Sequence, residues 1–312
     1  MRVDLGMKKH LKGFIHGILI GVAFISAMGG GTLAVILGIY DDLVAAITNL
    51  RKDFKNSVTY LAPILLGAIV GIVSLAYPIK LFLEWQPFIA ISLFVGLTIG
   101  GLVVFKNLTK GEAKFSNYLI AFAGFALVAL IGVISWFTPE SVSQSTTITL
   151  TFKEIMLLFT IGFFASSALI APGISGTMFL ISLGYYNKII ELIKVVLSFS
   201  ASSWGADFAL LMSFSVGFII GFFAISKLMD FLLKHFRNAT YFAILGLIVG
   251  QIVISYFNGE IKVAYSTVNF SLWQIVLSTA ALIIGVATSF ILLRIATKKE
   301  VINTIEVNDD AA

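Results

Sequence analysis

Six long apolar runs constrain this chain more than any other feature of its sequence. They cover about 57–77, 87–105, 118–137, 208–226, 241–257 and 272–293, and none of them contains an Asp, Glu, Lys or Arg residue. A helix needs ~20 apolar residues to cross the hydrocarbon core of a bilayer, so we interpret the six runs as transmembrane helices. The whole chain agrees, because 59% of its 312 residues are hydrophobic and only 12% are charged. These proportions exclude a water-soluble fold.

Two further apolar regions are too long for a single span, and small or helix-breaking residues interrupt each of them. The region 14–50 contains Gly29-Gly30-Gly31, and the region 154–199 contains Pro172-Gly173-Ile174-Ser175-Gly176. We predict that each region is a hairpin of two helical arms that meet at a non-helical tip. Whether a hairpin is re-entrant or fully spanning, the chain returns to the side from which it entered.

The basic residues orient these elements in the membrane. If the N-terminus is cytoplasmic, 16 of the 21 Lys and Arg residues lie on the cytoplasmic side, as the positive-inside rule requires. The remaining five are Lys80, Lys153, Lys188, Lys194 and Lys262. We therefore predict a multi-pass protein of the cell (plasma) membrane with both termini in the cytoplasm and an external loop over 139–153. In so apolar a chain the basic residues indicate orientation rather than nucleic-acid binding, so we expect no nucleic-acid partner.

The two halves of the sequence resemble each other. Gly67, Gly71, Gly96 and Gly100 recur 150 residues later as Gly217, Gly221, Gly246 and Gly250. Around the tips the offset is 146, as for Gly38 and Gly184, and near the ends a tripeptide Ile-Gly-Val at 131–133 matches one at 284–286, an offset of 153. Such coincidences indicate an internal repeat. Close packing of helices is a simpler explanation of the eight glycines themselves.

Each half thus holds one hairpin and three spans. Because three is odd, the second half enters the membrane from the opposite face. The predicted fold is an all-α polytopic membrane protein with an inverted-topology repeat, whose first copy covers 1–138 and whose second copy, with a cytoplasmic tail, covers 154–312. In transporters of this architecture the substrate site lies near the midplane of the bilayer, where the broken segments meet.

Both tips are uncharged and rich in groups that bind anions. The first reads Ser-Ala-Met-Gly-Gly-Gly-Thr over 26–32, and the second reads Pro-Gly-Ile-Ser-Gly-Thr over 172–177. A glycine-rich break that leads into a helix presents backbone N–H groups, and hydroxyls add further donors. We predict a site for phosphate or carboxylate formed by Ser26, Gly29, Gly30, Gly31, Thr32, Pro172, Gly173, Ser175, Gly176 and Thr177. A purely structural helix break is the alternative.

Four other residues are secondary candidates. Tyr40, Asp41 and Tyr186 follow the tips, where interfacial anchoring also explains tyrosines, and Gln251 is a polar residue inside a span. The chain has no cysteine and three histidines that are far apart in sequence. We therefore expect no metal site and no cofactor.

These motifs resemble the PopT-type polyprenyl-phosphate transporter family over roughly residues 8–297. The second tip matches the family's second motif up to Gly176, and Gly30-Gly31-Thr32 with Gly38-Ile39-Tyr40 matches the end of the first motif. The first tip departs from the family pattern over 26–29, where the family has Pro, Gly, Val and Ser in place of Ser, Ala, Met and Gly. The resemblance implies a flippase that moves undecaprenyl phosphate or a related polyprenyl phosphate between leaflets, which recycles the carrier lipid of cell-envelope synthesis.

Two other functions are alternatives to this one. A channel or secondary transporter for a small anionic solute would use the same tips. An intramembrane lipid-pyrophosphate phosphatase would need a nucleophile with a base, or carboxylates that hold a metal. Neither tip carries His, Asp or Glu, so we expect a transporter rather than an enzyme. The expected partners are a polyprenyl-phosphate lipid and the lipids of the membrane.

Overall fold

The regular structure of the computed structural model is helical throughout the residues that it describes. These residues are 2–25, 29–104, 108–109, 114–137, 150–174, 179–180, 182–198, 204–257, 261–262, 265 and 271–309. The first half contains α1 (Arg2–Ile25), α2 (Gly30–Ile36), α3 (Tyr40–Thr48), α4 (Phe54–Trp85), α5 (Pro87–Gly101), the 3-10 turn η1 (Leu102–Val104) and α7 (Phe115–Phe137). The second half contains α8 (Phe152–Ala165), α9 (Ser167–Ile170), α11 (Tyr186–Ser198), α12 (Trp204–His235), α13 (Arg237–Ile254) and α15 (Leu272–Asp309). The described part of the chain contains no strand, so the all-α fold class is confirmed.

Among the residues that the structure describes, six helical segments are long and apolar enough to cross a bilayer. They are Phe54–Leu75, Phe115–Phe137, Phe152–Ile170, Trp204–His235, Arg237–Ile254 and Leu272–Ile291. Five of them contain most of a predicted span, and Phe152–Ile170 is the first arm of the predicted second hairpin. The predicted span 87–105 is shorter in the structure, because α5 ends at Gly101 after 15 residues and a 3-10 turn follows. Two consecutive glycines, Gly100 and Gly101, weaken the helix at that point.

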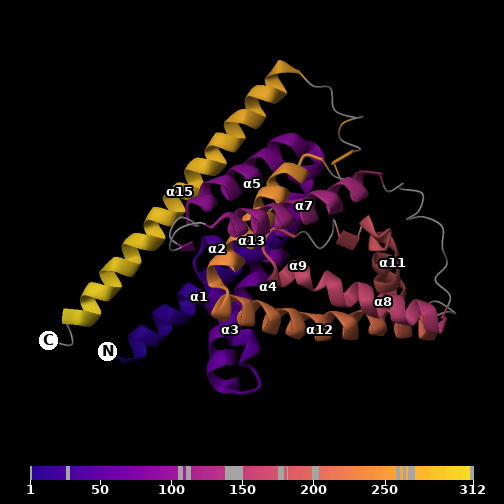
Figure 1. The fold of residues 1–312 in the computed structure, drawn as a ribbon, viewed down its shortest axis with the longest axis horizontal. Coiled ribbons are helices and arrows are strands. Elements are labelled where there is room, and N and C mark those ends of the chain that lie inside the picture. The colour runs from indigo at the N-terminus through magenta and orange to yellow at the C-terminus, as the bar shows by residue number, and fades with distance from the viewer. Residues whose placement is uncertain are drawn as a thin grey trace.

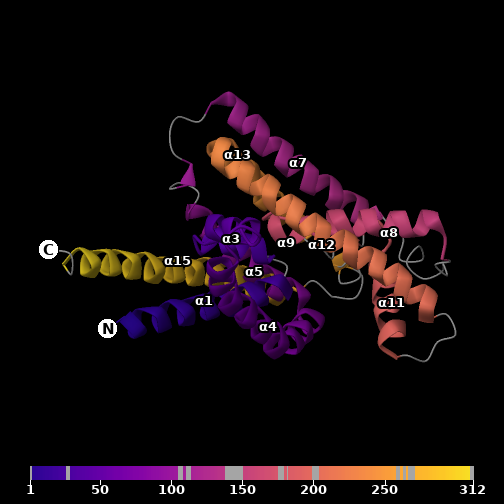
Figure 2. The same ribbon diagram turned by 90° about the horizontal axis from the view of Figure 1, so that it is seen from below.

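The long helices pack in close pairs. Within the first half α1 lies along α4, and within the second half α8 lies along α12 (Figure 1). Between the halves α5 lies along α15, and α7 lies along α13 (Figure 2). Both ends of the chain project from the same side of the molecule (Figures 1 and 2). This arrangement agrees with two termini on one side of a membrane, and the cytoplasmic assignment of that side stays a prediction.

The recurring glycines lie where the paired helices touch. A Cβ atom added to Gly67 or Gly71 would meet the backbone of α1, and one added to Gly217 or Gly221 would meet the backbone of α8. In the same way Gly96 and Gly100 face α15, whereas Gly246 and Gly250 face α7. Small residues let helices approach closely in a bilayer, where packing drives association. The packing explanation of these eight glycines is therefore confirmed.

Equivalent glycines contact equivalent neighbours, and these contacts correct one sequence offset. Gly246 faces the carbonyl of Ala121, whereas Gly96 faces the carbonyl of Leu282. If Gly96 and Gly246 correspond, as the predicted repeat requires, Ala121 corresponds to Leu282, which is 161 residues later. The tripeptide match at an offset of 153 does not join positions with equivalent contacts, so within the predicted repeat it is replaced by an offset of 161. Two further pairs of contacts give the same offset of 161 residues. Gly100 meets Val286 where Gly250 meets Phe125, and Gly285 meets Leu93 where Gly124 meets Ala243.

The first hairpin region bends again at a glycine that follows the tip, and the second region has a glycine of the same backbone conformation after its tip. α2 and α3 meet at 119°, and Gly38 forms the corner with a φ of 71°. Gly184 lies at the corresponding position before α11 with a φ of 72°. Residues with a Cβ atom avoid this left-handed region, whereas glycine adopts it readily. The second arm of the first hairpin is therefore an elbow and not one continuous helix, which corrects the prediction of two simple arms.

A buried core holds this elbow against the second half of the chain. It joins Tyr40 and Val44 of α3 to Ile170 of α9 and to Tyr241 and Ile244 of α13, all of them at most 2% exposed. Side chains from α12 complete the core, and α3 packs directly against that helix. The burial of these apolar groups fixes α3 in place and so positions the first tip beside the second.

Candidate functional site

The two tips contact each other, and a hydrogen bond joins them. The backbone N–H of Gly173 in the second tip donates to Thr32 Oγ1, near the start of α2, over 3.0 Å. Thr32 is 0% exposed, so this bond lies inside the protein. It spans 141 residues of sequence. It brings together two segments that the sequence analysis assigned to one site.

Gln251 of α13 lies beside the bond between the tips. Thr32 Oγ1 donates to Gln251 Oε1 over 3.2 Å, and Gln251 is 2% exposed. The Thr32 hydroxyl thus accepts one hydrogen bond from Gly173 and donates another to Gln251, which uses it in both of its roles. Buried polar groups need partners of this kind. Of the secondary candidates, Gln251 is the one that contacts the first tip directly.

The tips approach neighbouring backbone closely at two glycines. A Cβ atom on Gly31 would lie 3.4 Å from Pro172 Cα in the second tip. Gly173 has a φ of 84°, and a Cβ atom there would clash with the backbone of Leu247 and lie 2.6 Å from the Ile248 nitrogen. The second tip therefore rests directly on α13. A side chain at Gly173 would lift the second tip from that helix, whereas at Gly31 a side chain larger than that of alanine would push the tips apart.

The described residues include six of the ten predicted tip residues. Gly30, Gly31, Thr32, Pro172 and Gly173 are buried, and Gly29 is half-buried. The Gly29 N–H donates to Ala23 O over 2.9 Å, so this donor is used within the first tip. The other predicted tip residues, Ser26, Ser175, Gly176 and Thr177, lie outside the described residues.

Beyond the elbow, Tyr40 and Asp41 bind the second half of the chain. The Tyr40 hydroxyl donates to the Ile170 carbonyl over 2.7 Å, two residues before the second tip. One carboxylate oxygen of Asp41 accepts from the Tyr241 hydroxyl over 2.5 Å, and the other lies 2.8 Å from Arg237 Nη2. These two secondary candidates thus fasten α3 to α9 and α13. Tyr186 is the first residue of α11 and is half-buried.

The sequence analysis did not select Arg237 and Tyr241 as site residues. Arg237 was counted there only as one of the basic residues that indicate the orientation of the chain in the membrane. The two residues are four positions apart at the start of an apolar run, which places them on one face of a helix. That spacing is the signal that could have identified them, although their partner Asp41 is 200 residues away from Tyr241.

The site therefore has two parts that differ in chemistry. The tips and Gln251 provide neutral hydroxyl, amide and backbone N–H groups in a buried setting. Arg237 and Tyr241 provide a charged donor and a phenol at the other end of α13. Along the helix axis Arg237 lies about 21 Å from Gln251, since the two are 14 residues apart and each residue adds about 1.5 Å. Tyr241 lies about 9 Å from Leu247, the residue that Gly173 meets.

Comparison with known proteins assigns the chain to a family. The model of the VCA0040-like family, described as undecaprenyl phosphate translocase-like, matches residues 20–269. The chain belongs to this family. The matched region includes both tips, the elbow at Gly38 and all of α13, so the family extends over the whole candidate site. The resemblance stated from the motifs is confirmed.

Two similar proteins carry the same kind of name. A polyprenyl-phosphate transporter from Staphylococcus aureus (strain NCTC 8325 / PS 47) is 29% identical over 293 residues, which is 93% of this chain and 97% of that protein. A polyprenyl-phosphate transporter from Vibrio cholerae serotype O1 (strain ATCC 39315 / El Tor Inaba N16961) is 26% identical over 259 residues, which is 78% of this chain and 76% of that protein. No solved structure matches the chain. The family and both relatives are named for transport and not for an enzymatic activity.

Proposed function

We propose that this protein is a flippase that moves undecaprenyl phosphate, or a related polyprenyl phosphate, between membrane leaflets. Movement of this lipid would recycle the carrier used in cell-envelope synthesis. The names of the family and of the two relatives support the substrate class. The observation that carries the proposal is the hydrogen bond between Thr32 and Gly173, because it joins the two tips in one buried, uncharged polar site.

The chemistry of the tips suits a phosphate head group. Phosphate oxygens accept hydrogen bonds, and the tips supply the Gly173 N–H and the Thr32 hydroxyl, which are bonded to each other in this structure. In the proposed mechanism a phosphate enters between the tips and takes both groups as donors. Ser26, Ser175, Gly176 and Thr177 complete the site in this proposal. Hydroxyl, amide and backbone groups hold a phosphate, but they do not form the base and nucleophile that hydrolysis needs.

We propose a transport cycle in which the first hairpin arm of each half moves together with the long span of that half. The arm α1 packs along α4 in the first half, and α8 packs along α12 in the second. The other two close pairs, α5 with α15 and α7 with α13, join the halves to each other. In the proposed cycle, an inverted orientation of the halves opens the tips to each leaflet in turn while the prenyl tail stays in the lipid, as in alternating access.

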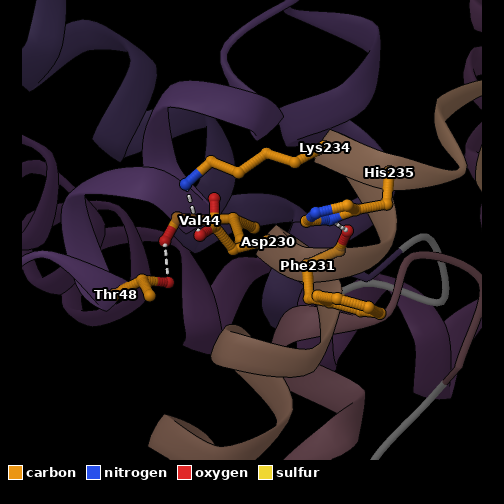
Figure 3. Close-up of polar contacts among 6 residues, drawn as sticks. All are labelled: Val44, Thr48, Asp230, Phe231, Lys234 and His235. Atoms are coloured by element: carbon orange, nitrogen blue, oxygen red, sulfur yellow. Dashed lines mark hydrogen bonds and ion pairs between the residues drawn. The ribbon is translucent and has the colours of Figure 1, made fainter.

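Reconstitution of the purified chain into liposomes tests this function. A labelled polyprenyl phosphate is added to one leaflet, and its arrival in the other is measured with time. We expect Thr32→Val to slow the exchange about tenfold, because it removes a buried hydroxyl that the phosphate needs, and Thr32→Ser to retain most of the rate. Thr48→Val is the matched control, because the Thr48 hydroxyl bonds only the Val44 carbonyl of its own helix, over 2.7 Å (Figure 3).

Two results would count against the proposal. If the Thr32→Val variant exchanged the lipid at the wild-type rate, the tips would not be the phosphate-binding site. If the wild-type chain carried a soluble phosphate ester across the membrane but left the lipid in place, the function would be that of a small-anion transporter.

A further inference from the structure

Arg237 and Tyr241 form a second anion-binding position that in this structure holds an internal carboxylate. The Arg237 Nη2 atom lies 2.8 Å from one oxygen of Asp41, and the Tyr241 hydroxyl donates to the other oxygen over 2.5 Å. Two donors on successive turns of α13 thus converge on the two oxygens of one anion. The same pair of donors fits two oxygens of a phosphate monoester, which guanidinium groups bind as readily as a carboxylate.

This position is open to the outside of the protein on one side and anchored on the other. The Arg237 side chain is 55% exposed and that of Asp41 is 33% exposed, whereas Tyr241 is only 2% exposed. A head group can therefore approach Arg237 without unfolding the helix that carries it. The buried Tyr241 ring fixes the position of the phenol, and the Arg237 guanidinium lies 5.3 Å from the centre of that ring.

Asp41 occupies the position with a side chain that is able to leave it. It is the second residue of α3, directly after the 119° bend at Gly38. The buried core holds the backbone of α3 in place, whereas the Asp41 side chain is 33% exposed. Rotation of this side chain would withdraw the carboxylate while Arg237 and Tyr241 of the continuous helix α13 stayed in place. Asp41 therefore acts as an internal substitute for the ligand.

We infer that Arg237 and Tyr241 are an entry site for the phosphate head group, which displaces Asp41 before it reaches the tips. This inference rests on the proposed function. The entry site is distinct from the tip site, since its nearest residue on α13, Tyr241, is about 9 Å along the helix axis from Leu247, against which the second tip packs. Displacement of Asp41 releases one of the bonds that fasten α3 to the second half. Arrival of the head group is thereby coupled to loosening of the elbow that carries the first tip.

The entry site is tested by measuring the affinity of single-residue variants for a lipid probe. The direction in which each variant changes the affinity is the decisive result. The probe is a fluorescent ten-carbon prenyl monophosphate, titrated onto the full chain in nanodiscs of zwitterionic lipid. We expect Arg237→Gln to weaken binding about tenfold or more, because a charge-assisted hydrogen bond is lost. Tyr241→Phe should weaken it several-fold. Asp41→Asn should strengthen binding several-fold, because the competing negative charge is removed.

A purely structural ion pair predicts a different pattern. In that case Asp41→Asn and Arg237→Gln would weaken binding together, and this result would overturn the entry site. Thermal unfolding of each variant shows that it folds, and Arg237→Lys keeps the charge if Arg237→Gln does not fold. The Lys234–Asp230 pair on α12 provides a matched control, with a distance of 2.6 Å and a lysine side chain that is 58% exposed (Figure 3). Lys234→Gln and Asp230→Asn should leave binding unchanged, and effects as large as those at Arg237 would contradict a specific site.

Two further ligands identify the group that is recognised. Inorganic phosphate should compete with the probe in the wild-type chain but not in Arg237→Gln, whereas equal competition in both would overturn the inference. The corresponding prenyl alcohol should bind equally to both chains, because it lacks the phosphate. Loss of lipid exchange in Thr32→Val together with no effect at Arg237 would leave the proposed function standing and refute the entry site alone. A wild-type chain that neither binds nor moves the lipid would refute both.

Discussion

At the scale of single residues, the site depends on how closely two backbones approach at the tips. Gly31 tests this point, because its φ is not in the left-handed region and the backbone of Pro172 and Leu169 limits its side chain. A Cβ atom at Gly31 would lie 3.4 Å from Pro172 Cα, which is an ordinary van der Waals contact. We expect Gly31→Ala to retain at least about half of the lipid exchange. Gly31→Val adds two further carbons and should reduce exchange about tenfold by forcing the tips apart, at a cost of ~1–3 kcal/mol from overpacking.

The comparison of these two variants separates steric contact from loss of flexibility. Equal exchange by Gly31→Ala and Gly31→Val, measured in the same liposomes, would show that the tips do not meet during transport. If Gly31→Ala alone already stopped exchange, the backbone would need conformations that this structure does not contain.

Residue chemistry also explains which parts of the site were predictable. Glycine and threonine in an uncharged helix break indicate anion binding by their own properties, so the tips could be selected from the sequence. Gln251 could be selected because an amide inside a span is rare. The pairing of Asp41 with Arg237 and Tyr241 could not, because it depends on where the elbow at Gly38 directs α3. Without that bend, Asp41 has the appearance of a residue leaving the membrane.

At the scale of helices, the glycines at the paired interfaces should control stability. A Cβ atom on Gly246 would meet the carbonyl of Ala121 across the α7–α13 contact. We therefore expect Gly246→Ala to destabilise the protein by ~1–3 kcal/mol, seen as a lower midpoint of thermal unfolding in detergent. Gly205→Ala is the matched control, because no described residue lies within 4 Å of a Cβ atom at that position in α12. It should stabilise the helix by up to about 1 kcal/mol.

The opposite signs of these two changes make the comparison informative. A drop in the midpoint for both variants would indicate a general intolerance of alanine. An unchanged midpoint for Gly246→Ala would contradict the tight contact between α7 and α13.

At the scale of the whole molecule, sequence reasoning identified the elements but not all of their relations. Apolar length alone located the spans, because a bilayer imposes it on every crossing helix. The predicted repeat rests on its glycines, since close helix packing restricts those positions. For the last span the tripeptide offset of 153 disagrees with the contacts, because a short tripeptide recurs by chance more easily than a set of contacts does. The neighbours of Gly96 and Gly246, and two further sets of contacts, give 161 instead.

The predicted inverted orientation of the halves can be tested by cysteine labelling, which suits this chain because its sequence contains no cysteine. Gly17 and Gly162 make equivalent contacts with α4 and α12, which relates α1 to α8 at an offset of 145. By that offset Lys8 corresponds to Lys153. We expect the Lys8→Cys variant to react with a membrane-impermeant maleimide only from the cytoplasmic side of cells or oriented vesicles. A cysteine at Lys153→Cys should react only from the outside, because an odd number of spans separates the halves.

A third single-cysteine variant gives the reference for this assay. Lys52 is exposed after α3, and the positive-inside rule places it on the same side as Lys8, so Lys52→Cys should label with Lys8→Cys. Labelling of Lys8→Cys and Lys153→Cys from one side would refute the inverted repeat, and with it the alternating exposure of the tips. If the two variants label from opposite sides but Lys8→Cys reacts from the outside, the inverted repeat stands and the termini lie outside. In that case Arg237, which the charge bias puts on the side of Lys52, would receive the lipid head group from the outer leaflet.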